Sequence, residues 1–191
     1  MTSAPARWVL SGGIGSGKST VREMLEERGL RTVDADRVGH LVLEDEAKDQ
    51  VSGRWPEVVV DGQIDRSRLA GIVFDDAAAR RELESMTHPH IFGRVVGLLD
   101  GYVGTAVVEM PLLTTILNWP RIVVDAADET RVERLLARGM PLDDIERRLA
   151  SQPDRGAWLA SADLVVPNHG SRDELRDAVG ELVSHLEKAA S

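Results

Sequence analysis

Short apolar runs alternate along this chain with longer stretches in which apolar residues recur every three or four positions. Five of the runs are rich in β-branched residues and predict buried strands, at residues 8–10, 31–33, 106–108, 122–124 and 164–166. The stretches between them predict helices. Because strands that alternate with helices form parallel sheets covered on both faces, we predict an α/β fold, a three-layer sandwich with a parallel central sheet.

Glycine and proline indicate where several of these helices begin and end. The segment from Lys18 to Arg28 is amphipathic, and Gly29 is expected to stop it. In the middle of the chain we expect one helix over residues 77–86 and a second that starts at Pro89. The reason is that proline suits the first helical turn and disrupts the interior.

Acidic and hydroxyl side chains predict three helix starts. Asp65 and Asp128 each stand at the beginning of an amphipathic stretch and are expected to act as N-caps. Ser171 and Glu174 have the spacing of a capping box. The helix that follows this box should bury four residues, Leu175, Val179, Leu182 and Leu186.

The segment from Gly12 to Ser19 matches the phosphate-loop pattern G-x-x-x-x-G-K-[ST]. Gly13, Gly15 and Gly17 allow backbone angles that turn successive N–H groups towards one anion. The helix that follows adds the positive end of its dipole. A glycine-rich surface turn is the structural alternative, but the strand before the segment and the helix after it favour phosphate binding.

The polar side chains of this loop have distinct expected tasks. Lys18 should contact the β- and γ-phosphates of ATP, the Ser19 hydroxyl should join the shell of a Mg²⁺ ion, and Thr20 should reach the α-phosphate. The predicted ATP-binding residues of the loop are Gly13, Ile14, Gly15, Ser16, Gly17, Lys18, Ser19 and Thr20. The loop alone does not separate kinases from ATPases and GTPases.

Composition restricts the partners and the cellular compartment that we expect for this protein. The 191 residues suit one domain, and a net charge of −9 makes nucleic acid an unexpected partner, so phosphate must be bound by local groups. Cysteine is absent, which excludes disulfides and thiolate metal sites and fits a reducing cytoplasm. We find no signal peptide and no apolar run near the roughly 20 residues that span a bilayer. We therefore expect a cytoplasmic protein without a membrane partner, monomeric or weakly self-associating.

The rest of the chain favours a kinase over other phosphate-loop classes. It has neither the Asn-Lys-x-Asp motif that binds guanine nor an Asp-x-x-Gly motif after a strand. A kinase for a small acceptor needs an acceptor-binding region and an arginine-bearing lid that excludes water. The helical middle of the chain and the segment from Arg131 to Arg155 can supply these two parts.

Six segments, in the same order and spread over nearly the whole chain, resemble motifs of the dephospho-CoA kinase family. They are residues 10–21 around the phosphate loop, Val33-Asp34-Ala35-Asp36, Asp61-Gly62-Gln63-Ile64-Asp65-Arg66, His88-Pro89-His90-Ile91, Met110-Pro111-Leu112-Leu113 and residues 162–170. The resemblance implies a fold like that of the nucleoside monophosphate kinases. Its core would comprise residues of about 1–35, 104–130 and 160–191, with an acceptor-binding subdomain of about 36–103 and a lid of about 138–157.

The same resemblance implies a reaction. MgATP would phosphorylate the ribose 3′-hydroxyl of dephospho-coenzyme A, which is the last step of coenzyme A synthesis. Asp36 would orient the acceptor hydroxyl and accept its proton, although its place before a helical pattern also suits an N-cap. Asp34, His88, Pro111 and Leu112 would lie on the acceptor side. For His88, capping a helix start is the alternative.

Further residues are candidates for the donor side and the lid. Asn168 matches the family's adenine-side loop but is also a common turn residue. Glu109 ends a predicted strand, where an acid can join the metal through water or can form a salt bridge. Arg138 and Arg148 are the lid residues expected to offset transition-state charge, unless they are only solvated helix charges. Arg131 and Arg147 are the other arginines considered in this stretch, and they are expected to lie on the surface.

Three stretches differ from the usual pattern of that family, all on the acceptor side. Gly39-His40 stand where an Ala-Arg pair is common in the family. Thr114-Thr115 replace an aromatic or aliphatic residue followed by Glu, and the stretch over residues 44–60 is shorter than is usual in the family. Two alternatives therefore stay open. One is a kinase for another acceptor, such as a nucleotide, nucleoside or sugar acid, and the other is a nucleotide-binding paralogue without catalysis.

Overall fold

The computed structural model describes residues 6–111 and 117–189. The chain divides into two compact units, one formed by Met1–Asp34 with Gly101–Ser191 and the other by Ala35–Asp100. We call the first the sheet unit, because it contains the parallel sheet, and the second the helical unit. Within the described residues, no helix is both long enough and apolar enough to cross a membrane.

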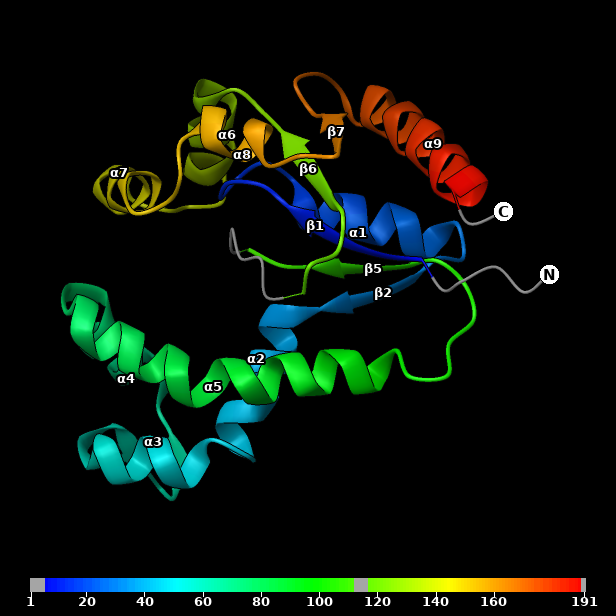
Figure 1. Cartoon of the computed structure of the whole chain (residues 1–191). Helices are drawn as coiled ribbons and strands as arrows, with labels where there is room; N and C mark the ends of the chain where they lie inside the picture. Colours follow the sequence, from blue (N-terminus) through cyan, green and yellow to red (C-terminus); the bar gives the residue numbers. More distant parts are fainter. Residues whose placement is uncertain (1–5, 112–116, 190–191) are drawn as a thin grey trace. The chain divides into compact units, whose positions relative to one another are not determined.

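The sheet unit is built on a five-stranded sheet in the order β2-β5-β1-β6-β7 (Figure 1). Its strands are β1 (Arg7–Ser11), β2 (Arg31–Asp34), β5 (Ala106–Glu109), β6 (Arg121–Asp125) and β7 (Leu164–Pro167). Every neighbouring pair is parallel. The predicted strands are thus confirmed, each one or two residues longer than the apolar run that indicated it, and the α/β prediction is confirmed with them.

One face of the sheet packs against α1 (Lys18–Glu27) and α9 (Arg172–Ala189), which contact each other (Figure 1). Strand residues two apart, such as Trp8 and Leu10 or Ile122 and Val124, supply this core because side chains alternate across a sheet. The four residues predicted for the last helix, Leu175, Val179, Leu182 and Leu186, are all buried in it. Each large side chain removed from water here contributes roughly 1.5–3 kcal/mol.

The capping predictions for this unit had mixed outcomes. The capping box that opens α9 is confirmed, since the Ser171 backbone N–H donates to Glu174 Oε2 at 2.6 Å and the Glu174 N–H donates to Ser171 Oγ at 3.3 Å. The prediction for Asp128 was wrong. The N-cap of α6 (Asp128–Ala137) is Ala127, and the Asp128 carboxylate pairs with Arg131 in the first turn.

Two further helices follow α6 in the sheet unit. Helix α7 (Leu142–Ala150) starts after Pro141, where the sequence predicted a short polar helix. Helix α8 (Arg155–Ala160) was not predicted, because six residues are too few to show a helical period. The side chain of Asp154 caps α8 by accepting a hydrogen bond from the Ala157 N–H at 2.7 Å.

The helical unit contains four helices, a short 3₁₀ turn and a hairpin in its described part. They are α2 (Ala35–Glu44), α3 (Lys48–Arg54), η1 (Pro56–Val58), β3 (Val59–Val60), β4 (Gln63–Ile64), α4 (Arg66–Asp75) and α5 (Ala77–Leu98). Helix α5 packs against both α2 and α4. Asp65 caps α4 as predicted, accepting from the N–H groups of Ser67 and Arg68. A side chain at Gly39 would meet Ile91 Cδ1 at 3.3 Å, so glycine allows α2 to approach α5 closely.

The predicted break at Pro89 was wrong, because α5 continues through it from Ala77 to Leu98. An interior proline leaves the carbonyl four residues earlier, that of Ser85, without its helical donor. The helix is nevertheless held at its start by the Asp76 side chain, which accepts from two backbone N–H groups, and along its length by the buried residues Thr87 and Val95. Packing of the helix in its unit outweighs the local preference of proline.

We therefore expect Pro89→Ala to stabilise the protein, by about 1–3 kcal/mol in the free energy of unfolding, because it restores a hydrogen bond inside a continuous helix. Thermal and denaturant unfolding of the ligand-free protein would measure it. Pro56→Ala is the matched control, since Pro56 stands at the start of η1, where proline suits the backbone. If Pro89→Ala gained no more stability than Pro56→Ala, a helix start at residue 89 would be the better description.

Candidate phosphate-binding site

The loop between β1 and α1 is shaped by three glycines with positive φ angles. Gly12, Gly15 and Gly17 have φ values of 145°, 77° and 99°, which side chains rarely tolerate. Gly13 is not one of them, so the sequence-based reason for a glycine at this position was wrong. A Cβ atom at Gly13 would lie 2.3 Å from Nη2 of Arg131. A side chain at position 13 would therefore displace the Arg131 guanidinium, which lies directly against Gly13.

The start of α1 carries the positive charge that an anion site needs. Its N-cap is Gly17, its first turn contains no acidic residue, and no side chain caps it. The helix dipole is therefore not offset within the helix itself. Lys18 Nζ adds an ammonium group, which donates to the carbonyl oxygens of Gly12 at 3.0 Å and Gly13 at 3.2 Å. An anion bound here would meet the helix end and this ammonium together.

Glu109 lies beside the loop at the end of β5 and is only 8% exposed. The Ser19 hydroxyl donates to its Oε1 at 3.1 Å, and Arg22 Nε donates to Oε2 at 2.9 Å. Burial raises the pKa of the Glu109 carboxyl, and the hydrogen bonds from Arg22 and Ser19 oppose that rise only in part. Asp34 is paired with Glu109 in the register of β2 and β5, so two acids stand at this edge of the sheet.

A cavity of about 350 Å³ opens on the other side of the loop, within the sheet unit. Its lining includes Gly17, Thr20, Arg134, Arg138, Asn168 and Leu175. Asn168 is buried and ties the loop to its surroundings, because its Nδ2 donates to the Ser16 carbonyl at 2.7 Å and its Oδ1 accepts from Arg134 Nη2 at 3.1 Å. The structure thus brings together three predicted residues that are far apart in the sequence, Thr20, Arg138 and Asn168.

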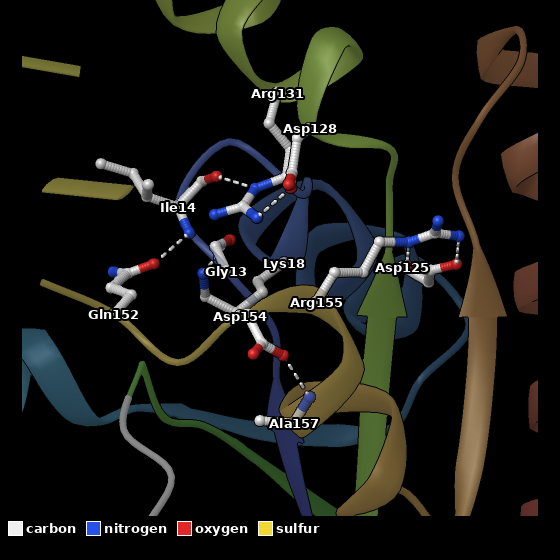
Figure 2. A network of polar contacts seen from close by, with 10 residues as sticks. All are labelled: Gly13, Ile14, Lys18, Asp125, Asp128, Arg131, Gln152, Asp154, Arg155 and Ala157. Carbon is white, nitrogen blue, oxygen red and sulfur yellow. Dashed lines mark hydrogen bonds and ion pairs between the residues drawn. The ribbon is translucent and has the colours of Figure 1, made fainter. Parts of the chain in front are cut away.

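The arginines of the predicted lid differ in their surroundings. Arg138 is exposed at the end of α6, and Arg148 is exposed on α7, where its Nε donates to Asp144 Oδ2 at 3.1 Å. Arg147 is exposed as well. The prediction that Arg131 lies on the surface was wrong, since it is 4% exposed and its Nε donates to the Ile14 carbonyl at 2.8 Å (Figure 2). It was missed because only the fold places this face of α6 against the loop.

The acceptor-side candidates lie partly in the helical unit. Asp36 is the second residue of α2 and exposed, so it is not the N-cap of that helix. His88 lies inside α5, which makes the helix-start interpretation wrong, and its ring meets the Phe92 ring edge-on at 5.6 Å between centroids. Pro111 is half-buried beyond the end of β5. Leu112, like Thr114 and Thr115, lies outside the described residues.

An ion pair between the buried Asp125, at the end of β6, and the exposed Arg155 was not predicted as part of the site. Asp125 accepts from Arg155 Nε and Nη2, both at 2.7 Å (Figure 2). Its Oδ2 also lies 3.1 Å from His169 Nε2. The paired Arg155 guanidinium lowers the pKa of the Asp125 carboxyl below its usual value. The acid itself was visible as a strand-end residue, but no sequence signal connects it to an arginine thirty positions later.

The raised pKa of Glu109 predicts how stability changes with pH. Because ionising Glu109 costs more in the folded chain than in the unfolded chain, wild type should be most stable relative to Glu109→Gln below the usual pKa of 4.5. That advantage should decline as the pH rises through the raised pKa, and stay constant above it. Melting temperatures of both proteins from about pH 4 to about pH 8 would measure this. A wild type that gained stability over the variant with rising pH would contradict the prediction.

Comparison with known proteins agrees with this geometry. A sequence model of the dephospho-CoA kinase family matches residues 8–174. The dephospho-CoA kinase of Thiobacillus denitrificans is 39% identical over 184 residues, with 91% of each chain covered, and that of Frankia casuarinae is 37% identical, with 93% of this chain and 82% of the relative covered.

Solved structures with a similar fold include a dephospho-CoA kinase. A Thermus thermophilus protein has a TM-score of 0.86 at 29% identity, over 95% of this chain and 98% of that one. The dephospho-CoA kinase of Campylobacter jejuni has a TM-score of 0.73 at 23% identity, over 98% and 100% of the chains, and supports the fold alone. Since the family model covers most of the sequence and the relatives match nearly end to end, this chain belongs to the dephospho-CoA kinase family.

Proposed function

We propose that this protein transfers the γ-phosphoryl group of ATP to the ribose 3′-hydroxyl of dephospho-coenzyme A, giving ADP and coenzyme A. The observation that carries the proposal is the phosphate loop, whose uncapped helix start and Lys18 ammonium suit a triphosphate, in a chain of the dephospho-CoA kinase family. Expectations for the individual residues follow from where they lie.

The donor is held by the sheet unit in this proposal. Lys18 and the loop N–H groups bind the β- and γ-phosphates, except the N–H of Ile14, which donates to Gln152, whereas the sequence predicted a contact with ATP. Thr20 reaches the α-phosphate. The adenine ring enters the cavity beside Asn168 and Arg138, where Leu175 and the stem of Arg134 offer apolar surface and the Asn168 loop offers polar groups. This arrangement extends the triphosphate along the start of α1, so that the γ-phosphate is presented near Glu109.

The residues near Glu109 also fit a magnesium ion that accompanies ATP. Ser19 Oγ would be its direct protein ligand, and the Glu109 carboxylate, 3.1 Å from that hydroxyl, would act through a bound water. Among residues 6–111 and 117–189, no three or more His, Cys, Asp or Glu side chains are grouped so that they could hold a metal ion by themselves. Phosphate oxygens and waters would therefore complete the shell. When bound, the ion would neutralise charge on the β- and γ-phosphates.

The acceptor is assigned to the helical unit and the end of β2. Asp36 accepts the proton of the 3′-hydroxyl while that oxygen bonds to the γ-phosphorus, and the bond from this phosphorus to the β–γ bridging oxygen breaks to release ADP. A cavity of about 770 Å³ within the helical unit, lined by His40, Leu43, Arg66 and Val73 among others, supports an acceptor-binding role for residues of about 36–103. Asp34 and His88 are further acceptor-side candidates.

The lid is assigned to residues of about 138–157, with Arg138 and Arg148 offsetting charge in the transition state. Arg148 is held by Asp144 in the structure, and Arg138 lines the nucleotide cavity. Their exposure suits residues that close over a ligand. The cytoplasm is the expected compartment.

The direct test is ADP release that depends on added dephospho-coenzyme A in the presence of Mg²⁺. Asp36→Asn should lower kcat by roughly 10²–10⁴-fold, because it removes the proton acceptor but little volume. Asp49→Asn, which changes an exposed acid in the first turn of α3, should leave kcat unchanged. An Asp36→Asn enzyme as fast as wild type would remove Asp36 from the mechanism.

A panel of acceptors separates this proposal from the other kinase activities that the sequence left open. Nucleosides, nucleotides and sugar acids would each replace dephospho-coenzyme A at matched concentration. Faster turnover of any of them would reassign the acceptor. Tight ATP binding without transfer to any acceptor would identify a nucleotide-binding protein without catalysis.

A further inference from the structure

The side chain of Gln152 reaches the phosphate loop from outside it. Its Oε1 accepts a hydrogen bond from the Ile14 backbone N–H at 2.8 Å (Figure 2). Gln152 is half-buried and stands in the connection between α7, which ends at Ala150, and α8, which begins at Arg155. It belongs to no motif that the sequence revealed, and the reaction described above does not use it.

The orientation of one peptide group shows what this contact does. The carbonyl oxygen of Gly13 accepts from Lys18 Nζ at 3.2 Å and from the Ser16 N–H at 3.2 Å. The peptide bond that joins Gly13 to Ile14 is trans, so its N–H points opposite to its carbonyl. The Ile14 N–H therefore points away from Lys18, and Figure 2 shows Gln152 and Lys18 on opposite sides of this peptide. Gln152 does not compete with a phosphate for the loop.

This peptide is restrained less than most by its own side chains, because its N-terminal residue is glycine. Rotation of a peptide plane changes ψ of the residue before it and φ of the residue after it. Glycine accepts the change in ψ at little cost, so resistance to reversal comes from Ile14 and from the hydrogen-bond partners of the peptide. The reversed orientation would turn the Gly13 carbonyl away from Lys18. The next carbonyl along the chain, that of Ile14, is held by Arg131 at 2.8 Å. Both backbone polar groups of Ile14 are thus fixed by side chains from distant parts of the sheet unit.

The segment that carries Gln152 is itself anchored to the sheet. Three residues after Gln152, the Arg155 guanidinium makes its two 2.7 Å contacts with Asp125 at the end of β6. Between them, Asp154 caps α8. These contacts tie the segment after Gln152 to the sheet that carries the loop.

We infer that Gln152 is a positioning residue for phosphoryl transfer, which fixes the Gly13–Ile14 peptide so that the Gly13 carbonyl holds the Lys18 ammonium at the phosphate site. The inference rests on the kinase activity proposed above. It assigns a role in catalysis to the connection between α7 and α8 that does not require contact with either substrate. It also links the lid to the loop, because Gln152 lies within residues of about 138–157, two positions after the end of α7.

Three variants separate this role from simple structural support. Gln152→Met keeps the length of the side chain but removes the acceptor, and Gln152→Glu keeps an acceptor oxygen. Gln50→Met is the matched control, since Gln50 is exposed on α3. Steady-state rates would be measured at saturating MgATP over a range of dephospho-coenzyme A concentrations, which gives kcat and KM. Saturating MgATP keeps the charge of the Glu variant from acting through ATP affinity. Melting temperatures would establish that each variant is folded.

We expect Gln152→Met to lower kcat about tenfold or more, because Lys18 stabilises charge that grows in the transition state. KM for dephospho-coenzyme A should change less than kcat. Gln152→Glu should stay within about threefold of the wild-type kcat, since it rescues the hydrogen bond. Gln50→Met should match wild type.

Two results would overturn the inference while leaving the proposed function intact. One is a Gln152→Met enzyme with kcat within about twofold of Gln50→Met, and the other is a folded Gln152→Glu enzyme as slow as Gln152→Met. If Gln152→Met does not fold, Gln152→Asn, whose amide is one methylene too short to reach Ile14, takes its place with the same expected loss. A wild-type protein without dephospho-CoA-dependent turnover would instead overturn the proposed function, and this inference with it.

Discussion

A phosphate loop must turn several backbone N–H groups towards one point, and glycine is the residue that permits it. The same glycines leave the loop free to adopt other shapes, which would scatter those groups. The surrounding structure removes that freedom. Arg131 and Gln152 hold Ile14, Asn168 holds the Ser16 carbonyl, and the Lys18 ammonium bridges two carbonyls of the loop itself. The shape of the site is therefore a property of the whole sheet unit.

The parallel sheet explains why these partners converge. Parallel strands place all their carboxyl ends at one edge, and the segments that follow the strands begin there. The loop follows β1, α6 follows β6, and the loop with Asn168 follows β7, so residues over 150 positions apart become neighbours. The acids Asp34, Glu109 and Asp125 arrive at this edge for the same reason.

Charge is balanced at this edge pair by pair. The chain carries a net charge of −9, yet the site has to attract a polyanion. Glu109 is paired with Arg22, and Asp125 is paired with Arg155, so two of the acids at this edge face neighbouring guanidinium groups. The positive start of α1 carries no acid in its first turn. A local field can thus favour phosphate binding in an acidic protein, since exposed charges beyond about 10 Å are screened by salt.

The sequence by itself determined the five strands, the phosphate loop and the capping box of α9, because each depends on a local pattern of a few residues. It also determined the family, because several such local motifs occur in the family's order. Only the tertiary structure decided that Pro89 lies inside one helix, that Gly13 packs against the Arg131 guanidinium, and that Arg131 is buried against the loop. These facts depend on which surfaces meet. A side chain such as Gln152 has no local signature, since its importance comes from a backbone group 138 residues away.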